Sequence, residues 1–269
     1  MAIISGLYLY PVKSCGGISL PEAELAETGL RFDRHWMVID RRGKFVTQRD
    51  LPGMARIVPH LAAGRLVLSA PGTEAVVLPT RDGGDRVRVT VWGDQCFGLD
   101  QGDAAARWLS AFLGEELRLV RFDRSAPRRN STGAGAARTL AEFADGHALL
   151  VISEASLADL NNRLALPLPM NRFRPNIVIA GIEAYEEDHL RSLKSDDIEL
   201  RLVEPCIRCQ ITMTDQDTGE VGEEPMRTLL TYRSHPKLGG VSFGQKASIA
   251  RGAGQRLRIG QELEELWSF

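Results

Sequence analysis

The chain has 269 residues, of which 43% are hydrophobic and 25% charged, and its formal net charge is −2. Those values are ordinary for a globular protein, and the near-neutral balance argues against nucleic acid or an anionic membrane as the partner. The chain has too few cysteines for a disulfide framework, no stretch as long as a membrane span and no secretory leader, so we expect a cytoplasmic protein without a membrane anchor.

Short strand signals dominate the first half of the chain. Residues 6–14, GLYLYPVKS, alternate in polarity, and residues 35–50 predict a hairpin that turns at Arg42 and Gly43. Further strands, separated by Gly, Pro and Asp, are predicted at residues 65–70, 75–80 and 86–93.

Two helices are predicted after these strands. The first covers residues 103–113, with Asp103 as its N-cap and Gly114 as its end. Its apolar face consists of Trp108, Leu109, Phe112 and Leu113. The second covers residues 153–164, is capped by Ser153, and directs three side chains inward: Leu157, Leu160 and Leu164.

The remaining segments define the predicted fold class. Residues 123–140 have no apolar periodicity and predict a loop. Strand candidates follow at residues 148–152, 175–181, 198–206, 209–215 and 255–266. The chain has no GxGxxG or Walker motif, which gives no support to a nucleotide-binding fold. We therefore predict a strand-dominated α+β protein with a barrel-like sheet.

Half of the cysteines, Cys206 and Cys209, lie in EPCIRCQITMTDQDTGE, residues 204–220. A structural zinc site needs four ligands, and the other two thiols, Cys15 and Cys96, are distant in sequence. A redox dithiol normally begins a helix, whereas the residues that follow, QITMTD, resemble a strand. Two small buried side chains beside a turn remain a third interpretation.

Cationic and polar residues stand where predicted strands break. Arg208, between the two cysteines, favours a thiolate and is suited to a bidentate grip on phosphate. Lys13 and Ser14 lead into a Gly-Gly turn that presents backbone N–H groups, and Arg174 and Asn176 flank a proline before an apolar strand. A solvated turn or a loop cap explains each of these residues equally well when it is taken alone.

Arg34 adds a further cation, beside Trp36 in the string DRHW. A surface ion pair with Asp33 is the alternative interpretation. One soft thiolate together with several cations that bind phosphate describes a phosphate-bearing metal cofactor better than a bare ion.

Five strings, in this order, together resemble the MOSC-domain family, the relatives of the molybdenum cofactor sulfurase C-terminal domain: YPVKSCGG, GLRFDRHWMVID, LVISEASLADLNNRL, NRFRPNIVIAG and EPCIRCQITMTDQDTGE. Within that family the mitochondrial amidoxime-reducing components and their bacterial relatives are the nearest in pattern. The resemblance covers nearly the whole chain, and the last string, FRPN and PVKSC are its most specific parts.

The resemblance implies a molybdenum–molybdopterin cofactor. Since the second cysteine of the pair ligates molybdenum in the family, Cys209 is implied as the metal ligand and catalytic centre, with Cys206 as a neighbour. The resemblance implies these cofactor-binding residues: Lys13, Ser14, Arg34, Arg174, Asn176 and Arg208.

Residues 145–147 hold the weaker candidates. Relatives contact the cofactor here through small hydroxyl residues, where this chain has Gly146 and His147, whose backbone N–H groups can substitute. Asp145 and His147 are candidates for proton relay. The alternative is a loop carboxylate and an exposed imidazole.

The resemblance also predicts the domain organisation. Residues 1–120 are expected to form the N-terminal region, whose first strands, to about residue 55, join the barrel, and residues 121–269 the MOSC β-barrel. The barrel is then assembled from both ends of the chain, with a middle segment inserted. We expect neither the N-terminal membrane anchor of the animal relatives nor the ferredoxin-like domain of some bacterial ones.

The implied activity is two-electron reduction of an N-hydroxylated substrate, such as an amidoxime or a hydroxylamine. The electrons would come from an external flavin, haem or iron–sulfur protein, and the arginines of residues 123–140 suggest an acidic partner unless that loop is merely solvated. Two alternatives remain: a sulfurtransferase that carries a persulfide on Cys209, and a non-catalytic molybdopterin carrier.

Overall fold

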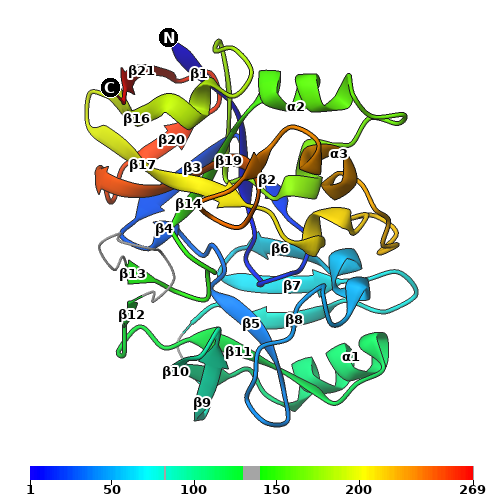
Figure 1. Cartoon of the computed structure of the whole chain (residues 1–269). Helices are drawn as coiled ribbons and strands as arrows, with labels where there is room; N and C mark the ends of the chain where they lie inside the picture. Colours follow the sequence, from blue (N-terminus) through cyan, green and yellow to red (C-terminus); the bar gives the residue numbers. More distant parts are fainter. Residues whose placement is uncertain (82, 130–139, 269) are drawn as a thin grey trace.

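The computed structural model describes residues 1–81, 83–129 and 140–268, and its central feature is a closed β-barrel (Figure 1). The barrel strands pair in the order β14–β15–β1–β21–β16–β17–β19, and β19 pairs again with β14. All neighbouring pairs are antiparallel except β14–β15, which is parallel. The barrel strands are β1 (Ala2–Leu9), β14 (Leu149–Ser153), β15 (Ile177–Ala180), β16 (Leu190–Ser195), β17 (Ile198–Ile207), β19 (Gly240–Arg251) and β21 (Glu262–Trp267).

Alternating side chains fill the barrel. Along β17, Ile198, Leu200 and Leu202 are buried while the residues between them are more exposed, as a period of two requires. β1 comes from the N-terminus but lies between β15 and β21, where Ile3 pairs with Ala180 and Ala2 with Leu263. The barrel is thus assembled from both ends of the chain.

The middle of the chain forms two further sheets, which lie below the barrel in Figure 1. One has the order β5–β11–β10–β9 and the other β6–β7–β8, with helix α1 (Asp103–Leu113) packed beside them. Their strands are β5 (Trp36–Asp40), β6 (Val58–Ala62), β7 (Arg65–Ser69), β8 (Val76–Pro79), β9 (Arg86–Val91), β10 (Asp94–Asp100) and β11 (Leu117–Phe122). The strand-dominated fold class and the barrel are confirmed.

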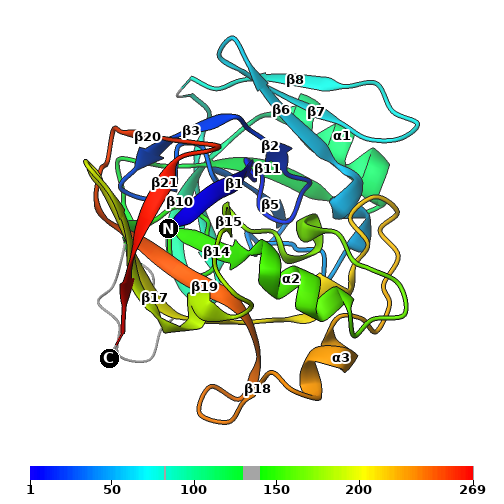
Figure 2. The same cartoon turned by 90° about the horizontal axis from the view of Figure 1, so that it is seen from above.

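Short elements complete the structure. Helix α2 (Glu154–Asn161) lies against β14 and β15, as Figure 2 shows from above. The other helix is α3 (Met226–Leu230), and 3₁₀ turns cover Pro52–Arg56, Met170–Phe173, Glu186–His189 and Gln210–Met213. The short strands are β2 (Ile18–Ser19), β3 (Glu22–Ala26), β4 (Gly29–Leu30), β12 (Arg128–Arg129), β13 (Leu140–Ala141), β18 (Ser234–His235) and β20 (Arg256–Arg258).

The two predicted helices are present, but one predicted cap is wrong. Ser153 caps α2 as predicted, because its Oγ accepts a hydrogen bond from the Ser156 N–H at 3.0 Å. The N-cap of α1 is Gly102, and Asp103 is the first helical residue, where its carboxylate accepts a hydrogen bond from Arg118 at 3.0 Å. An acidic first-turn residue is favourable without being a cap, because it faces the positive end of the helix dipole.

The predicted strand at residues 209–215 is also wrong. The ladder between β17 and β19 ends at Ile207, after which the Arg208 N–H donates to the Val241 carbonyl at 2.8 Å. Beyond that point the backbone bonds locally, since Thr212 donates to Cys209 and Thr214 to Ile211, each at 3.1 Å. Cys209 therefore immediately precedes a 3₁₀ turn.

The structure describes only the two ends of the predicted loop at residues 123–140. β12 pairs with β13 at the two ends of the loop, and residues 130–139 lie outside the described residues.

The predicted domain boundary at residue 120 falls within β11, and the division into two domains stays a prediction. Among the described residues, no helix combines the length and apolarity needed to cross a bilayer.

Candidate functional site

A cavity of about 400 Å³ opens where the barrel meets the N-terminal sheets. It is lined by the turn after β1, the end of β17, the segment before β14, the β9–β10 turn and one residue of β19. The structure brings every predicted site residue to this cavity: Lys13, Ser14, Arg34, Asp145, Gly146, His147, Arg174, Asn176, Arg208 and Cys209. Their roles in cofactor binding and catalysis stay predictions.

Four residues that line the cavity have left-handed backbone conformations. The φ angles are 65° at Ser14, 48° at Arg34, 54° at Trp92 and 57° at Arg174. Residues other than glycine adopt this region at a cost on the order of 1 kcal/mol or more, and such residues cluster at functional sites. Hydrogen bonds hold two of these turns, since the Arg34 N–H donates to the Tyr10 carbonyl at 2.7 Å and the Arg174 N–H to the Asn171 carbonyl at 3.2 Å.

Arg34 and Arg174 converge on the ring of buried Tyr10. Their Cζ atoms lie 4.5 and 4.4 Å from the ring centroid. Arg34 pairs with Asp33 and donates to Asn176 Oδ1 at 3.0 Å, while Arg174 donates to the Cys15 carbonyl at 2.6 Å. Burial, reinforced by the positive charge of Arg34, lowers the pKa of Arg174 to about 10. Two guanidinium groups are therefore held close together in a largely dry setting.

Lys13 and Asp145 form an ion pair at the cavity, in which the Lys13 side chain is buried and that of Asp145 is half exposed. Lys13 also donates to the Phe143 carbonyl at 2.8 Å, and burial lowers the pKa of its ammonium against the opposing pull of Asp145. Desolvation acts to raise the pKa of Asp145, but the charge of Lys13 and hydrogen bonds from Lys13 and Trp92 hold it below its usual range. Asp145 is thus a carboxylate at neutral pH.

The two neighbouring cysteines have different surroundings. Cys206 is partly buried, and Arg208 contacts its Sγ at 3.0 Å while donating to the Phe173 carbonyl at 2.6 Å. Cys209 is exposed, and its Sγ lies 3.6 Å from Nη1 of Arg49. Cys209 is therefore the thiol that is open to a ligand in the cavity.

His147 is buried, so the alternative of an exposed imidazole is wrong. Its Nε2 lies 3.6 Å from Glu204, whose carboxylate pairs with Lys246 at 2.9 Å. Burial lowers the pKa of His147 although Glu204 acts to raise it, so the ring is neutral at pH 7. Both ring nitrogens lack a hydrogen-bond partner among the described residues.

Sequence reasoning missed several residues that line the cavity, among them Arg49, Trp92 and Lys246. Arg49 lies in the string VTQRD, Trp92 in the turn between β9 and β10, and Lys246 in β19. None carries a strand-break signal like that of Arg174. The one available hint is the dipeptide Trp92-Gly93, because a bulky residue is unusual at the first position of a tight hairpin turn.

The donors of this cavity fit an anionic cofactor that carries a soft metal. Six cationic side chains line the cavity, namely Lys13, Arg34, Arg49, Arg174, Arg208 and Lys246, and Asp145 is the one carboxylate among the described lining residues. Nε of Arg208 is buried and lacks a hydrogen-bond partner in the described part of the chain. Guanidinium groups suit phosphate, and a thiolate suits a soft metal.

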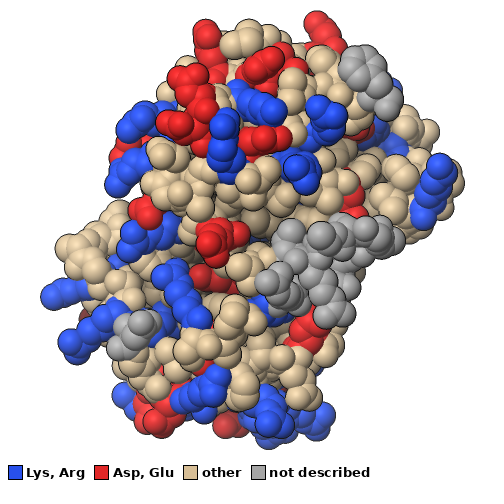
Figure 3. All heavy atoms as spheres, turned by 90° about the vertical axis from the view of Figure 1, so that its left-hand side faces the viewer, with Lys and Arg blue, Asp and Glu red and all other residues tan. Residues whose placement is uncertain are grey.

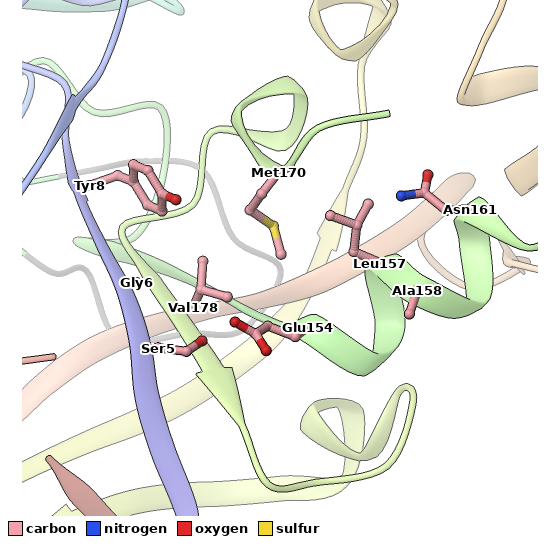
Figure 4. Close-up of a pocket in the computed structure, with 9 residues that line it drawn as sticks. All are labelled: Ser5, Gly6, Tyr8, Glu154, Leu157, Ala158, Asn161, Met170 and Val178. Atoms are coloured by element: carbon pink, nitrogen blue, oxygen red, sulfur yellow. The ribbon is translucent and has the colours of Figure 1, made fainter. Parts of the chain in front are cut away.

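A second, smaller cavity of about 290 Å³ lies among β1, β15 and α2 (Figure 4). Ser5 and Glu154 point toward each other there, and Leu157, Met170 and Val178 supply apolar surface. It contains none of the predicted site residues and no cationic side chain, so it does not match the predicted chemistry.

Comparisons with known proteins agree with the family resemblance of the sequence motifs. The MOSC N-terminal beta barrel domain model matches residues 1–116, and the MOSC domain model matches residues 139–264. The chain is 40% identical to mitochondrial amidoxime-reducing component 1 of Homo sapiens, over 90% of this chain and 77% of that protein. It is 37% identical to mitochondrial amidoxime reducing component 2 of Rattus norvegicus, over 86% of this chain and 72% of that one. The chain therefore belongs to the MOSC-domain family that includes the amidoxime-reducing components.

Proposed function

We propose that this protein is a molybdenum-cofactor-dependent oxidoreductase that reduces N-hydroxylated compounds, such as amidoximes and hydroxylamines. The observation that carries the proposal is the exposed thiol of Cys209 at a cavity lined by six cationic side chains. The names of the relatives, which describe amidoxime reduction, support the substrate class.

The chain's own residues would hold the cofactor from two sides. Lys13, Arg34 and Arg174 present charges from the N-terminal turns and from the segment before β15. Arg208, just after β17, presents an Nε that has no hydrogen-bond partner among the described residues. Asn176 already orients Arg34. Arginine forks bind phosphate in a defined direction, so this set orients the cofactor as well as retaining it.

Cys209 is the proposed metal ligand and Cys206 is not. When bound, the molybdenum cofactor supplies the two-electron chemistry at the N–O bond. The overall reaction consumes two electrons and two protons and releases the amine-level product and water. Both thiols line the cavity, but Cys206 is partly buried and already in contact with Arg208, whereas Cys209 is exposed.

Protons are the second requirement. Neutral His147 can hold a proton on one ring nitrogen and accept one on the other, and its Nε2 faces Glu204. Asp145, held as a carboxylate, is suited to accept rather than to donate. We therefore propose His147 as the proton carrier and Asp145 as the group that fixes Lys13 and Trp92.

Electrons would come from an external electron-transfer protein in the cytoplasm. Lys, Arg, Asp and Glu side chains are interspersed on the face shown in Figure 3. This face therefore offers local charge pairs rather than a field of one sign.

The decisive experiment measures molybdenum per chain and reductase activity together, on protein from a host that makes the cofactor. We expect near-stoichiometric molybdenum, and reduction of benzamidoxime with a reduced viologen dye as the electron donor. Cys209→Ser should abolish activity and Cys206→Ser should retain most of it. Metal-free protein with a labile sulfur on Cys209 would instead indicate sulfur transfer, and metal-loaded protein without turnover would indicate a carrier.

A further inference from the structure

An exposed tryptophan stands at the mouth of the cavity. Trp92 is 44% exposed, and it alone among the exposed large hydrophobic side chains of the described chain lines this cavity. The part of the indole that its neighbours leave uncovered offers apolar surface to a ligand.

The indole is held in place at that position. Its Nε1 donates to Asp145 Oδ1 at 2.7 Å, and the guanidinium of Arg49 lies 4.5 Å from the ring centroid. The ring centroids of Phe45 and Trp92 are 5.2 Å apart. The backbone of Trp92 is left-handed, at the first position of a two-residue turn between Val91 and Asp94. Asn, Asp or Gly would suit that position better, so local turn preference does not explain the tryptophan.

The indole is also close to the proposed reaction centre. Arg49 spans the gap, because its guanidinium stacks on Trp92 while its Nη1 lies 3.6 Å from Cys209 Sγ. A substrate whose N–O bond reacts at a group held by Cys209 could therefore extend the rest of its body beside the indole.

We infer that Trp92 is a specificity-determining residue, which selects N-hydroxylated substrates whose reacting group is conjugated to a flat aromatic body. The inference rests on the proposed function. An aromatic ring gains stacking on the indole that a methyl group cannot gain, which corresponds to a preference of roughly two- to ten-fold.

The kinetic test compares two substrates that share one reacting group. Benzamidoxime carries a phenyl ring and acetamidoxime a methyl group, so the ratio of their kcat/KM values isolates the contribution of the ring. We expect Trp92→Leu to lower this ratio roughly two- to ten-fold, mainly through KM, with partial recovery in Trp92→Phe. Trp267→Leu is the matched control, since Trp267 is 36% exposed on β21 and lies outside the cavity.

The ratio also separates this role from others. Loss of the hydrogen bond to Asp145 affects both substrates alike and cancels, and molybdenum per chain reports any loss of cofactor. A ratio unchanged by Trp92→Leu would overturn the inference, even if both activities fell.

A binding measurement does not depend on turnover. The measurement records the indole N–H signals of ¹⁵N-tryptophan-labelled protein by NMR, and Trp92→Phe assigns the signal of Trp92. In the absence of an electron donor, benzamidoxime should shift the Trp92 signal, and acetamidoxime should shift it much less. No movement would refute the stacking site. If the Trp92 signal moves but neither amidoxime is reduced, the reductase is refuted and the stacking site is kept. If both amidoximes are reduced and Trp92→Leu leaves the ratio of kcat/KM values unchanged, the reductase is kept and the stacking site is refuted.

Discussion

Removing the charge of Asp145 should destabilise the cofactor-free protein, because it is the counter-ion of a buried ammonium. The Lys13 side chain is 5% exposed and that of Asp145 54%. In Asp145→Asn the ammonium keeps its bond to the Phe143 carbonyl but loses its nearest negative charge. The positive charges of Arg128 and Arg34, which also act to lower the pKa of Lys13, are then less compensated.

The magnitude lies between two limits. Breaking a fully buried ion pair costs about 3–5 kcal/mol, whereas a surface pair contributes at most about 1 kcal/mol. Because one partner is buried and the other half exposed, we expect a loss of about 1–3 kcal/mol. A double-mutant cycle with Lys13→Met should return a coupling energy of the same size.

The pH dependence gives the prediction a sign. The folded-state pKa of Asp145 lies below the ordinary value of 3.8, so its stabilising contribution is complete above about pH 5 and is lost as the pH falls through the folded pKa. The difference in unfolding free energy between wild type and Asp145→Asn should therefore stay constant above about pH 5 and shrink as the pH falls below that value.

Urea unfolding of cofactor-free protein at several pH values measures both quantities. Glu223→Gln is the control, because Glu223 and Arg227 form a pair in which both side chains are exposed, and the change should alter stability by less than about 1 kcal/mol. A coupling energy near zero, or parallel loss of stability in both proteins below pH 5, would refute this account of the pair.

Two further predictions concern the cofactor grip and the fold. Arg174→Lys keeps a charge but loses the guanidinium that reaches the Cys15 carbonyl and Gln216, so the molybdenum retained after dialysis should fall at least several-fold. Arg172 lies outside the cavity, and Arg172→Lys should retain the metal. Equal retention of molybdenum in both variants would contradict this role of Arg174. Ser153→Ala removes the side-chain cap of α2 and should lower the unfolding free energy by about 1–2 kcal/mol in urea; a loss below about 0.3 kcal/mol would count against the cap.

Sequence patterns predicted the parts of the fold that depend on local chemistry. The capped helix at Ser153 and the alternation of β17 follow from residue preference and periodicity. The strand expected at residues 209–215 is absent for a non-local reason, because the ladder between β17 and β19 ends at Ile207. Strand propensity cannot indicate where the partner strand ends.

The residues of the candidate site also divide into those that local sequence patterns reveal and those that depend on tertiary structure. Residues beside a proline or a glycine pair, such as Arg174 and Lys13, could be recognised because a strand break is visible in the sequence. Arg49 and Trp92 could not, since their place at the cavity depends on where the N-terminal sheets meet the barrel. The left-handed backbone of Arg34 is likewise set by tertiary hydrogen bonds, such as the one to the Tyr10 carbonyl.

The charge balance of the cavity links its stability to its function. Six cationic side chains face one lining carboxylate among the described residues, with Asp33 and Glu204 behind Arg34 and Lys246. Burial, and to a lesser extent the positive charge of Arg34, lowers the pKa of Arg174, so holding cations together in this dry setting has a cost. An anionic ligand that offsets the excess charge binds the folded chain but not the unfolded one, so its binding free energy adds to the stability of the fold. The unfavourable gathering of cations and the affinity for an anionic cofactor are therefore two consequences of the same arrangement.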